Sequence, residues 1–238
     1  MNIEPIRPDR LTIGIGFDQS EAVAYHVLCH SILSRSSIPV RFIPIKRTLL
    51  RSMHTRKIEP EQSNEFSFTR FLLPHLCDHE GVSLFMDCDI LCRTDIARIF
   101  DHYNPFAAVH VVKHDYTPKT STKYLGNVQH RYPRKNWSSV MLFNNALCRK
   151  LTPSVVEKAS GAELHQFKLF RDESIAELPK EWNHLVTEMP PNPDAKLVHW
   201  TIGGPWFDEY KHAEFSDEWF RERALTLGCS NMDRSAVA

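Results

Sequence analysis

The chain has 238 residues, of which 42% are apolar and 24% charged, and its 29 Lys and Arg balance its 29 Asp and Glu. These values exclude wholesale disorder, and the absence of a basic excess argues against a nucleic-acid partner. The chain has no apolar run long enough for a membrane span, a polar beginning unlike a signal peptide, and six cysteines without a CxxC pair. We therefore expect one cytoplasmic domain over residues 1–238, without a transmembrane segment.

Residues 11–45 predict a β-α-β unit. Residues 11–17 form an apolar run typical of a buried strand, residues 21–35 carry apolar side chains at helical spacing, and residues 40–45 return as a strand. Ser20 is the candidate N-cap of the helix. Such a unit favours a right-handed crossover and a mainly parallel sheet, with ligands beyond the carboxyl ends of its strands.

Helices and strands continue to alternate along the rest of the chain, which predicts the α/β class. Helices are expected at 68–76, 96–103 and 216–227, and from Thr152-Pro153 to a stop at Gly161. Strands are expected at 82–86, 106–112, 139–143 and 196–200.

Asp87 and Asp89 follow the apolar strand expected at 82–86 and carry the sharpest chemical signal. Side chains two apart on an extended backbone point the same way, so the two carboxylates can converge on one object. Side by side they repel each other, and a divalent cation with hard oxygen ligands relieves that repulsion. Removal of either acid should therefore leave the fold as stable or more stable. The alternative is that both are turn-forming residues at a strand end.

The segments around this motif resemble the family 8 glycosyltransferases. The resemblance is carried by Phe68-Thr69-Arg70 through Asp87-Cys88-Asp89, by Ile15-Gly16-Phe17-Asp18, by Ser139-Val140-Met141-Leu142-Phe143-Asn144, by Leu178-Pro179 with Trp182-Asn183, and by His199-Trp200-Thr201-Ile202-Gly203-Gly204-Pro205-Trp206. These segments keep the family's order between residues 11 and 207.

The resemblance implies a GT-A fold that transfers a hexose from a nucleotide-diphosphate sugar, with UDP-hexose as the expected donor and with retention at the anomeric carbon. It implies a nucleotide-binding part at 11–92, an acceptor-binding and metal-completing part at 93–207, and a C-terminal helix at 216–227. The acceptor could be a glycan, a lipid or a protein. Asp87, Asp89 and His199 would hold Mn²⁺ or Mg²⁺, and an imidazole ligand suits manganese better than magnesium.

The same resemblance assigns roles to further residues. Phe17, Asp18 and the backbone of Cys88 would bind the base and ribose, and Arg70 would bind the diphosphate or sugar. Asp172 and Glu173 would be catalytic groups beside the reacting sugar. Each has a plainer alternative. His199 could be an ordinary core histidine, Arg70 a surface ion pair, and Asp172 and Glu173 a solvated helix end.

One residue of the family pattern is missing. Gly203 and Gly204 stand where the family has a Lys on the donor phosphates. Residues 113–135 gather six Lys and Arg against a single acid and show no regular period, which predicts a loop. We expect this loop to close over the donor, with Lys119 or Lys123 nearest the phosphates. A solvated surface loop is the alternative.

Two other functions remain open on the sequence. A nucleotidyltransferase or phosphohydrolase could use the same metal-carboxylate site, although residues 14–19 lack the Gly-rich basic loop typical of a nucleotidyltransferase. A degenerate module that binds a nucleotide or sugar without turnover would also explain the missing Lys.

Overall fold

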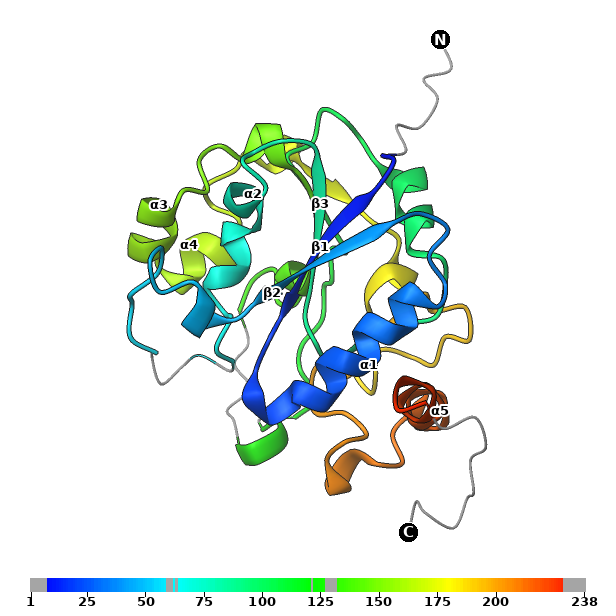
Figure 1. The fold of residues 1–238 in the computed structure, drawn as a ribbon. Coiled ribbons are helices and arrows are strands. Elements are labelled where there is room, and N and C mark those ends of the chain that lie inside the picture. The colour runs from blue at the N-terminus through cyan, green and yellow to red at the C-terminus, as the bar shows by residue number, and fades with distance from the viewer. Residues whose placement is uncertain (1–7, 59–61, 63, 121, 127–131, 229–238) are drawn as a thin grey trace.

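The computed structural model describes residues 8–228 apart from 59–61, 63, 121 and 127–131. Its centre is a six-stranded sheet with the strand order β2-β1-β3-β6-β5-β7, flanked by helices (Figure 1). The strands are β1 (Leu11–Gly16), β2 (Val40–Ile45), β3 (Val82–Met86), β5 (Val109–Val111), β6 (Val140–Asn144) and β7 (Ile175–Glu177). The sequence predicted all of these strands except β7, which has only three residues.

The sheet is mainly parallel, as expected. Strand β1 pairs in parallel with β2 and β3, and β7 pairs in parallel with β5. Strand β6 pairs antiparallel with both β3 and β5, so it alone runs against the other five. Helix α1 (Ala22–Leu33) makes the crossover between β1 and β2 that parallel pairing requires. These pairings confirm the α/β class.

A second, three-stranded sheet has the order β4-β9-β8. Its strands are β4 (Ile90–Cys92), β9 (Leu197–His199) and β8 (His184–Leu185). Strand β4 begins directly after Asp89, and β9 pairs antiparallel with it. The small sheet therefore brings a late part of the chain to the carboxyl end of β3.

Several helices differ in type or bounds from the prediction. The other α-helices are α2 (Leu73–Leu76), α3 (Pro153–Lys158), α4 (Gly161–His165) and α5 (Ser216–Thr226). The chain also forms 3-10 turns at Gln19–Glu21, Arg47–Leu49, Thr69–Leu72, Ile96–His102, Tyr124–Gly126, Trp137–Ser139, Asn145–Cys148, Asp172–Ser174, Lys180–Asn183 and Asp208–Tyr210. The helix expected at 68–76 is thus a 3-10 turn followed by α2, and the one expected at 96–103 is a 3-10 turn.

Two predicted helix signals were wrong, and local hydrogen bonds explain why. Gly161 begins α4 instead of ending α3, because Ser160 and Glu163 form a capping box. Ser20 is not the N-cap of α1. Its backbone amide donates to the side chain of Asp18, which caps the preceding 3-10 turn, and α1 begins after Glu21.

Close packing at the end of β1 positions the residues behind the site. A Cβ atom on Gly16 would lie 2.3 Å from the ring of Phe66, so only glycine allows this ring to pack there. The rings of Phe66 and Phe85 each lie 5.1 Å from the guanidinium carbon of Arg70. Gly16 in β1 thus makes room for the ring of Phe66, and that ring packs against Arg70.

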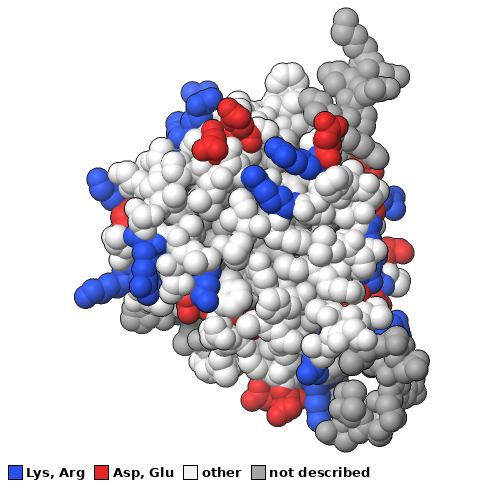
Figure 2. Space-filling view, viewed as in Figure 1, with Lys and Arg blue, Asp and Glu red and all other residues white. Residues whose placement is uncertain are grey.

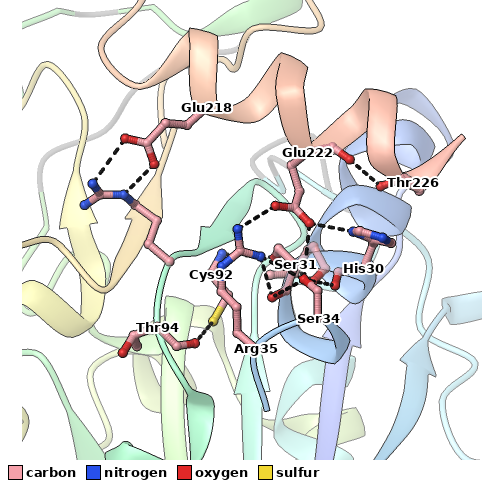
Figure 3. A network of polar contacts seen from close by, with 11 residues as sticks. His30, Ser31, Ser34, Arg35, Cys92, Thr94, Glu218, Glu222 and Thr226 are labelled. Carbon is pink, nitrogen blue, oxygen red and sulfur yellow. Dashed lines mark hydrogen bonds and ion pairs between the residues drawn. The ribbon is translucent and has the colours of Figure 1, made fainter. Parts of the chain in front are cut away.

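Helix α5 packs beside α1 through a buried acid (Figures 1 and 3). Glu222 is 3% exposed and accepts hydrogen bonds from His30 on α1, at 2.5 Å, and from Arg35 just after it, at 2.7 Å. Burial acts to raise the pKa of Glu222, but the hydrogen bonds from Arg35 and His30 outweigh it and lower the pKa below the ordinary glutamate value. The ionised acid therefore holds the C-terminal helix in place.

On the face shown in Figure 2, side chains of both charge signs lie around the margin of a largely uncharged centre. Among the described residues, none of the helices has both the length and the apolar composition needed to cross a bilayer.

Candidate active site

Three metal-ligand candidates converge at the carboxyl end of β3. Asp87 and Asp89 follow this strand, and His199 ends β9, where it pairs with Ile90. The backbone amide of Trp200 donates to the carbonyl of Asp89 at 3.0 Å, which locks this register. One ligand atom from each of Asp87, Asp89 and His199 lies within 4.8 Å of the others. The structure thus brings together the three residues that the sequence proposed as metal ligands.

A buried amide orients the imidazole of His199. Asn183 donates its side-chain N–H to the carbonyl of Asn136 at 3.1 Å, which leaves its Oδ1 facing Nδ1 of His199 at 2.9 Å. Because Oδ1 can only accept, Nδ1 of His199 carries the hydrogen. Asn183 is fully buried, so this relationship is fixed by packing as well as by hydrogen bonds.

The resulting arrangement fits a bound cation. With Nδ1 donating to Asn183, Nε2 of His199 faces Oδ1 of Asp89 at 3.2 Å. An imidazole lone pair and a carboxylate oxygen both accept hydrogen bonds, so a proton or a metal ion between them is needed to make this approach favourable. Two carboxylates and an imidazole are suitable ligands for a divalent ion. The donor set therefore fits Mn²⁺ or Mg²⁺.

Arg70 contacts one of these carboxylates. It is 3% exposed, lies 2.8 Å from Oδ1 of Asp87, and donates to the carbonyl of Ser138 at 2.9 Å. Burial raises the pKa of Asp87, and the neighbouring Arg70 acts against that rise. The expectation of a simple surface ion pair is excluded by this burial, and Arg70 belongs to the site.

These groups surround a cavity of about 50 Å³. Its lining comprises Asn64, Arg70, Asp87, Asp89, Lys123, Tyr124, Tyr132, Asn136, Ser138, Ser139, His199 and Thr201. A water molecule occupies about 30 Å³ of liquid, whereas pockets for small organic ligands measure roughly 300–1,000 Å³. The cavity is thus large enough for an ion with its nearest water and too small for a nucleotide-sugar.

The predicted loop supplies one wall of this cavity. Tyr124 donates its backbone N–H to Ile202 at 2.8 Å, stacks on Phe207 with 4.8 Å between ring centroids, and donates its hydroxyl to Glu21 at 2.9 Å. These contacts hold Lys123 at the cavity. Lys119 does not line the cavity, and its ammonium donates a hydrogen bond to the carbonyl of Thr187. Residues 121 and 127–131 of the expected lid fall outside the described residues.

The residues expected at the base and ribose do not line this cavity. Both oxygens of Asp18 are engaged, one by the amide and hydroxyl of Ser20 and the other by the amide of Glu65. The ring of Phe17 lies 4.5 Å from the ammonium of Lys46. Cys88 is fully buried, with its thiol 3.9 Å from Glu21. Phe17 and Asp18 lie at the carboxyl end of β1, beside the metal-ligand candidates.

Packing accounts for the two glycines that replace the family's Lys. A Cβ atom on Gly203 would lie 2.4 Å from the ring of Tyr210, and one on Gly204 would lie 2.1 Å from the ring of Trp206. Both positions therefore need glycine for close aromatic packing, independently of any phosphate.

The expected catalytic acids are not brought to the cavity. Asp172 and Glu173 are exposed in a 3-10 turn, and neither lines the cavity. Asp172 forms an ion pair with Arg134 at 2.6 Å, and the guanidinium of Arg134 lies 5.1 Å from the ring of Trp137.

Sequence reasoning missed Glu21, Tyr124 and Asn183 as parts of the site. Glu21 is 2% exposed, and burial, followed by the charge of Asp89, raises its pKa well above the ordinary value. In the sequence Glu21 looked like the first residue of an amphipathic helix, and Tyr124 like a loop residue. Asn183 lay in a matched segment, but its hydrogen bond to His199 depends on the pairing of β8 with β9.

A relative of known sequence matches most of the chain. Protein CDI of Arabidopsis thaliana is 45% identical over 219 residues, which cover 88% of this chain and 85% of the Arabidopsis protein. No known protein-family model matches the chain.

Solved structures of similar fold are glycosyltransferases. The bifunctional glycosyltransferase WbbM matches with a TM-score of 0.60 and 17% identity over 93% of this chain and 51% of the WbbM chain. The galactosyltransferase LgtC, solved with donor and acceptor sugar analogs, matches with a TM-score of 0.58 and 12% identity over 94% of this chain and 98% of LgtC. The chain thus spans about half of WbbM and nearly all of LgtC. These similarities confirm the expected GT-A type of fold, and the sequence identity to the Arabidopsis protein shows that this chain belongs to the family of protein CDI.

Proposed function

We propose that the chain is a metal-dependent, retaining glycosyltransferase that moves a hexose from a nucleotide-diphosphate sugar, with UDP-hexose as the donor. The observation that carries the proposal is the convergence of Asp87, Asp89 and His199 at the carboxyl end of β3 in this fold. The acceptor is a glycan, a lipid or a protein.

The proposed roles are those that the family resemblance implies, and the geometry of the site supports several of them. Asp87, Asp89 and His199 would hold Mn²⁺ or Mg²⁺, which when bound offsets the charge of the donor diphosphate and of the departing nucleotide. Arg70, which packs against the rings of Phe66 and Phe85, supplies a cation to the sugar or phosphate side of the cavity. Phe17 and Asp18 lie at the end of β1, where the base and ribose are proposed to bind, with the backbone of Cys88 nearby.

The loop that carries Lys119 and Lys123 is proposed as the lid. A cavity of about 50 Å³ cannot hold a nucleotide-sugar, so the segment around Lys123 and Tyr124 has to move for the donor to enter. Lys123 already lines the cavity, which supports it as the phosphate ligand in place of the missing Lys. Lys119 could take that role only by leaving the carbonyl of Thr187.

The carboxylates of the site favour front-side attack over a covalent intermediate. Among the described residues that line the cavity, Asp87 and Asp89 are the only acids, and both are engaged as metal-ligand candidates. A donor phosphate oxygen is then proposed to accept the proton of the acceptor hydroxyl. Asp172 or Glu173 is proposed to steady positive charge on the sugar ring. For Asp172 this role requires its ion pair with Arg134 to open.

Nucleotide release tests the proposal directly. The protein is incubated with a panel of nucleotide-sugars, Mn²⁺ and candidate acceptors, and the products are followed by mass spectrometry. Release of a nucleoside diphosphate that disappears in Asp89→Asn is expected. Pyrophosphate chemistry would identify a nucleotidyltransferase or phosphohydrolase instead, and binding without release would identify a degenerate binding module.

A further inference from the structure

We propose that a surface groove lined by Phe106, Leu147 and Phe170 binds an extended segment of a partner protein, in which apolar side chains are flanked by acidic residues. The groove has a volume of about 280 Å³. This inference concerns a second surface of the molecule, so it goes beyond the proposed function and does not depend on it.

The groove lies at the end of the central sheet opposite the metal-ligand candidates. Strands β3 and β6 are antiparallel, so Asp87 lies where β6 begins, whereas Leu147 lies in the 3-10 turn just after β6 ends. Ala108 and Ser174, which also line the groove, directly precede β5 and β7 at that same end. The groove is therefore separate from the cavity at the carboxyl end of β3.

Two apolar side chains of the groove are largely open to solvent. Phe106 is 81% exposed, the largest exposed fraction among the large apolar side chains of the described residues, and Leu147 is 47% exposed. Single exposed apolar side chains are common on protein surfaces, but these two line one groove together with Leu169 and Phe170. A contiguous apolar surface that is bordered by charged residues is typical of a protein-binding site.

The turn that carries Phe106 is held by hydrogen bonds on several sides. The side chain of Asn104 accepts from the backbone amide of Phe106 at 3.0 Å, and the backbone amide of Asn104 donates to Nε2 of His110 at 2.8 Å. The carbonyl of Pro105 accepts from the side chain of Asn144 at 2.9 Å. The backbone of Phe106 is thus fixed although its ring is not packed into the core, which lowers the entropy that is lost when a partner binds.

The charges of the groove indicate which kind of segment binds there. Lys150 and Arg171 line the groove, and none of its described lining residues is an acid. Neither cation forms an ion pair with a described residue, and Asp172, next to Arg171, is paired with Arg134. Carboxylates on either side of the apolar side chains of a partner segment would meet these two cations.

Other occupants fit the groove less well. In a two-fold dimer that brought two such grooves together, Lys150 and Arg171 would face the same cations of a second copy. An anionic bilayer would balance the charges, but its flat surface would leave the concave part of the groove unfilled. An extended protein segment meets both requirements, because its side chains fill the groove and its acids balance the cations.

The test is an NMR titration of the isotope-labelled protein at low salt with two peptides, Glu-Asp-Phe-Leu-Glu-Asp and Lys-Arg-Phe-Leu-Arg-Lys. The acidic peptide should shift the amide signals of Phe106 and Leu147 and bind about tenfold more tightly than the basic one. Phe106→Ala should weaken its binding about tenfold or more, because the ring is no longer buried by the peptide. The matched control is Leu33→Ala, which removes another exposed apolar side chain, on α1, and should bind like the native protein.

A second pair of variants tests the charges. Lys150→Glu should weaken binding of the acidic peptide about tenfold or more, because the new carboxylate repels those of the peptide. Lys168→Glu is the control, since Lys168 is exposed on the same side of the chain sequence but does not line the groove. Both lysines are exposed, so both variants should fold, and this pair serves even if Phe106→Ala does not.

Several outcomes would overturn the inference. These are no binding of the acidic peptide, equal binding of both peptides, or native affinity in Phe106→Ala and Lys150→Glu. Dimerisation that Phe106→Ala abolishes, measured by analytical ultracentrifugation, would assign the groove to a second copy instead. Binding to phosphatidylserine vesicles without binding of the acidic peptide would assign it to a membrane surface. Nucleotide release in Phe106→Ala should stay native in every case, so these results leave the proposed function untouched.

Discussion

His199 donates its Nδ1 hydrogen to Oδ1 of Asn183 across 2.9 Å, and this bond turns Nε2 toward Asp89. The same asparagine is held by the carbonyl of Asn136, so the orientation of the imidazole depends on a residue that does not line the cavity. Outer hydrogen bonds of this kind set the tautomer and the basicity of metal-binding histidines.

Replacing Asn183 should therefore weaken metal binding from a distance. In Asn183→Ala the imidazole loses its fixed tautomer, and we expect Mn²⁺ affinity to fall about 10- to 100-fold. The control is Asn145→Ala, another fully buried asparagine, which bonds Ser83 and the carbonyl of Glu80. Both variants should lose roughly 1–3 kcal/mol of unfolding free energy, but only the first should lose Mn²⁺ affinity in calorimetry. Equal Mn²⁺ affinities in the two variants would contradict the role of Asn183.

The two acids of the site should differ in their effect on stability. Asp89→Ala removes a carboxylate from a crowded site, so the metal-free protein should be as stable as the native one or more stable. Asp87→Ala leaves the buried guanidinium of Arg70 without its partner, and a loss of about 3–5 kcal/mol is expected. This revises the sequence-based expectation, which treated both acids alike because the ion pair with Arg70 was not visible.

Urea denaturation without metal measures this difference, and nucleotide release measures activity, which both variants should lose. Asp87→Ala with native stability would show that the ion pair with Arg70 contributes nothing.

The hydrogen bond from the hydroxyl of Tyr124 to Glu21 should keep the segment around Lys123 closed. Tyr124→Phe removes the hydrogen bond to Glu21 and leaves the stack on Phe207, so the segment around Lys123 should open more often. Limited trypsin digestion should then cut this segment faster than in the native protein, and Mn²⁺ with a nucleoside diphosphate should slow the cut. Tyr103→Phe, whose ring stacks on His110 away from the cavity, is the control. A native cleavage rate in Tyr124→Phe would show that Glu21 does not secure the lid.

The buried acid of α5 should make stability depend on pH. The pKa of Glu222 is lower in the folded protein than in the unfolded chain. Its contribution to the free energy of unfolding is therefore fully present above its unfolded-state pKa and is lost as the pH falls through its folded-state pKa. Glu222→Gln should be less stable than the native protein by about 1–3 kcal/mol at pH 7, and the two should converge in acid. Glu218→Gln on the same helix removes a more exposed ion pair with Arg93 and should cost about 1 kcal/mol or less. Urea denaturation at a series of pH values provides the comparison.

The sequence was most informative where the signal is local. Strands β1 and β3 are apolar runs with largely buried side chains, and the pair Asp87 and Asp89 follows directly after β3. Short elements such as β7 have too few residues to produce a period. Gly161 by itself predicted the end of a helix, but the capping box of Ser160 and Glu163 makes it the first residue of α4.

The parts of the site that could not be predicted depend on contacts between distant segments. Lys119 and Lys123 occupy the same loop and have the same chemistry, and only the anchoring of Tyr124 on Ile202 and Glu21 decides which of them faces the carboxylates. The placement of Asp172 depends in the same way on Arg134, which comes from another loop. Periodicity carries no information about such pairings.

The reversed direction of β6 has a consequence for how this protein can vary. Strand β5 leaves the sheet at the site end and β6 enters from that end, with Val111 paired to Met141. Residues 112–139 are thus one connection between two adjacent antiparallel strands, anchored at its far end where the amide of Asp87 donates to Ser139. Such a connection can change in length and sequence while the register of the sheet is kept. Sequence changes in this connection can therefore alter the wall of the cavity while the strand that positions Asp87 and Asp89 stays as it is.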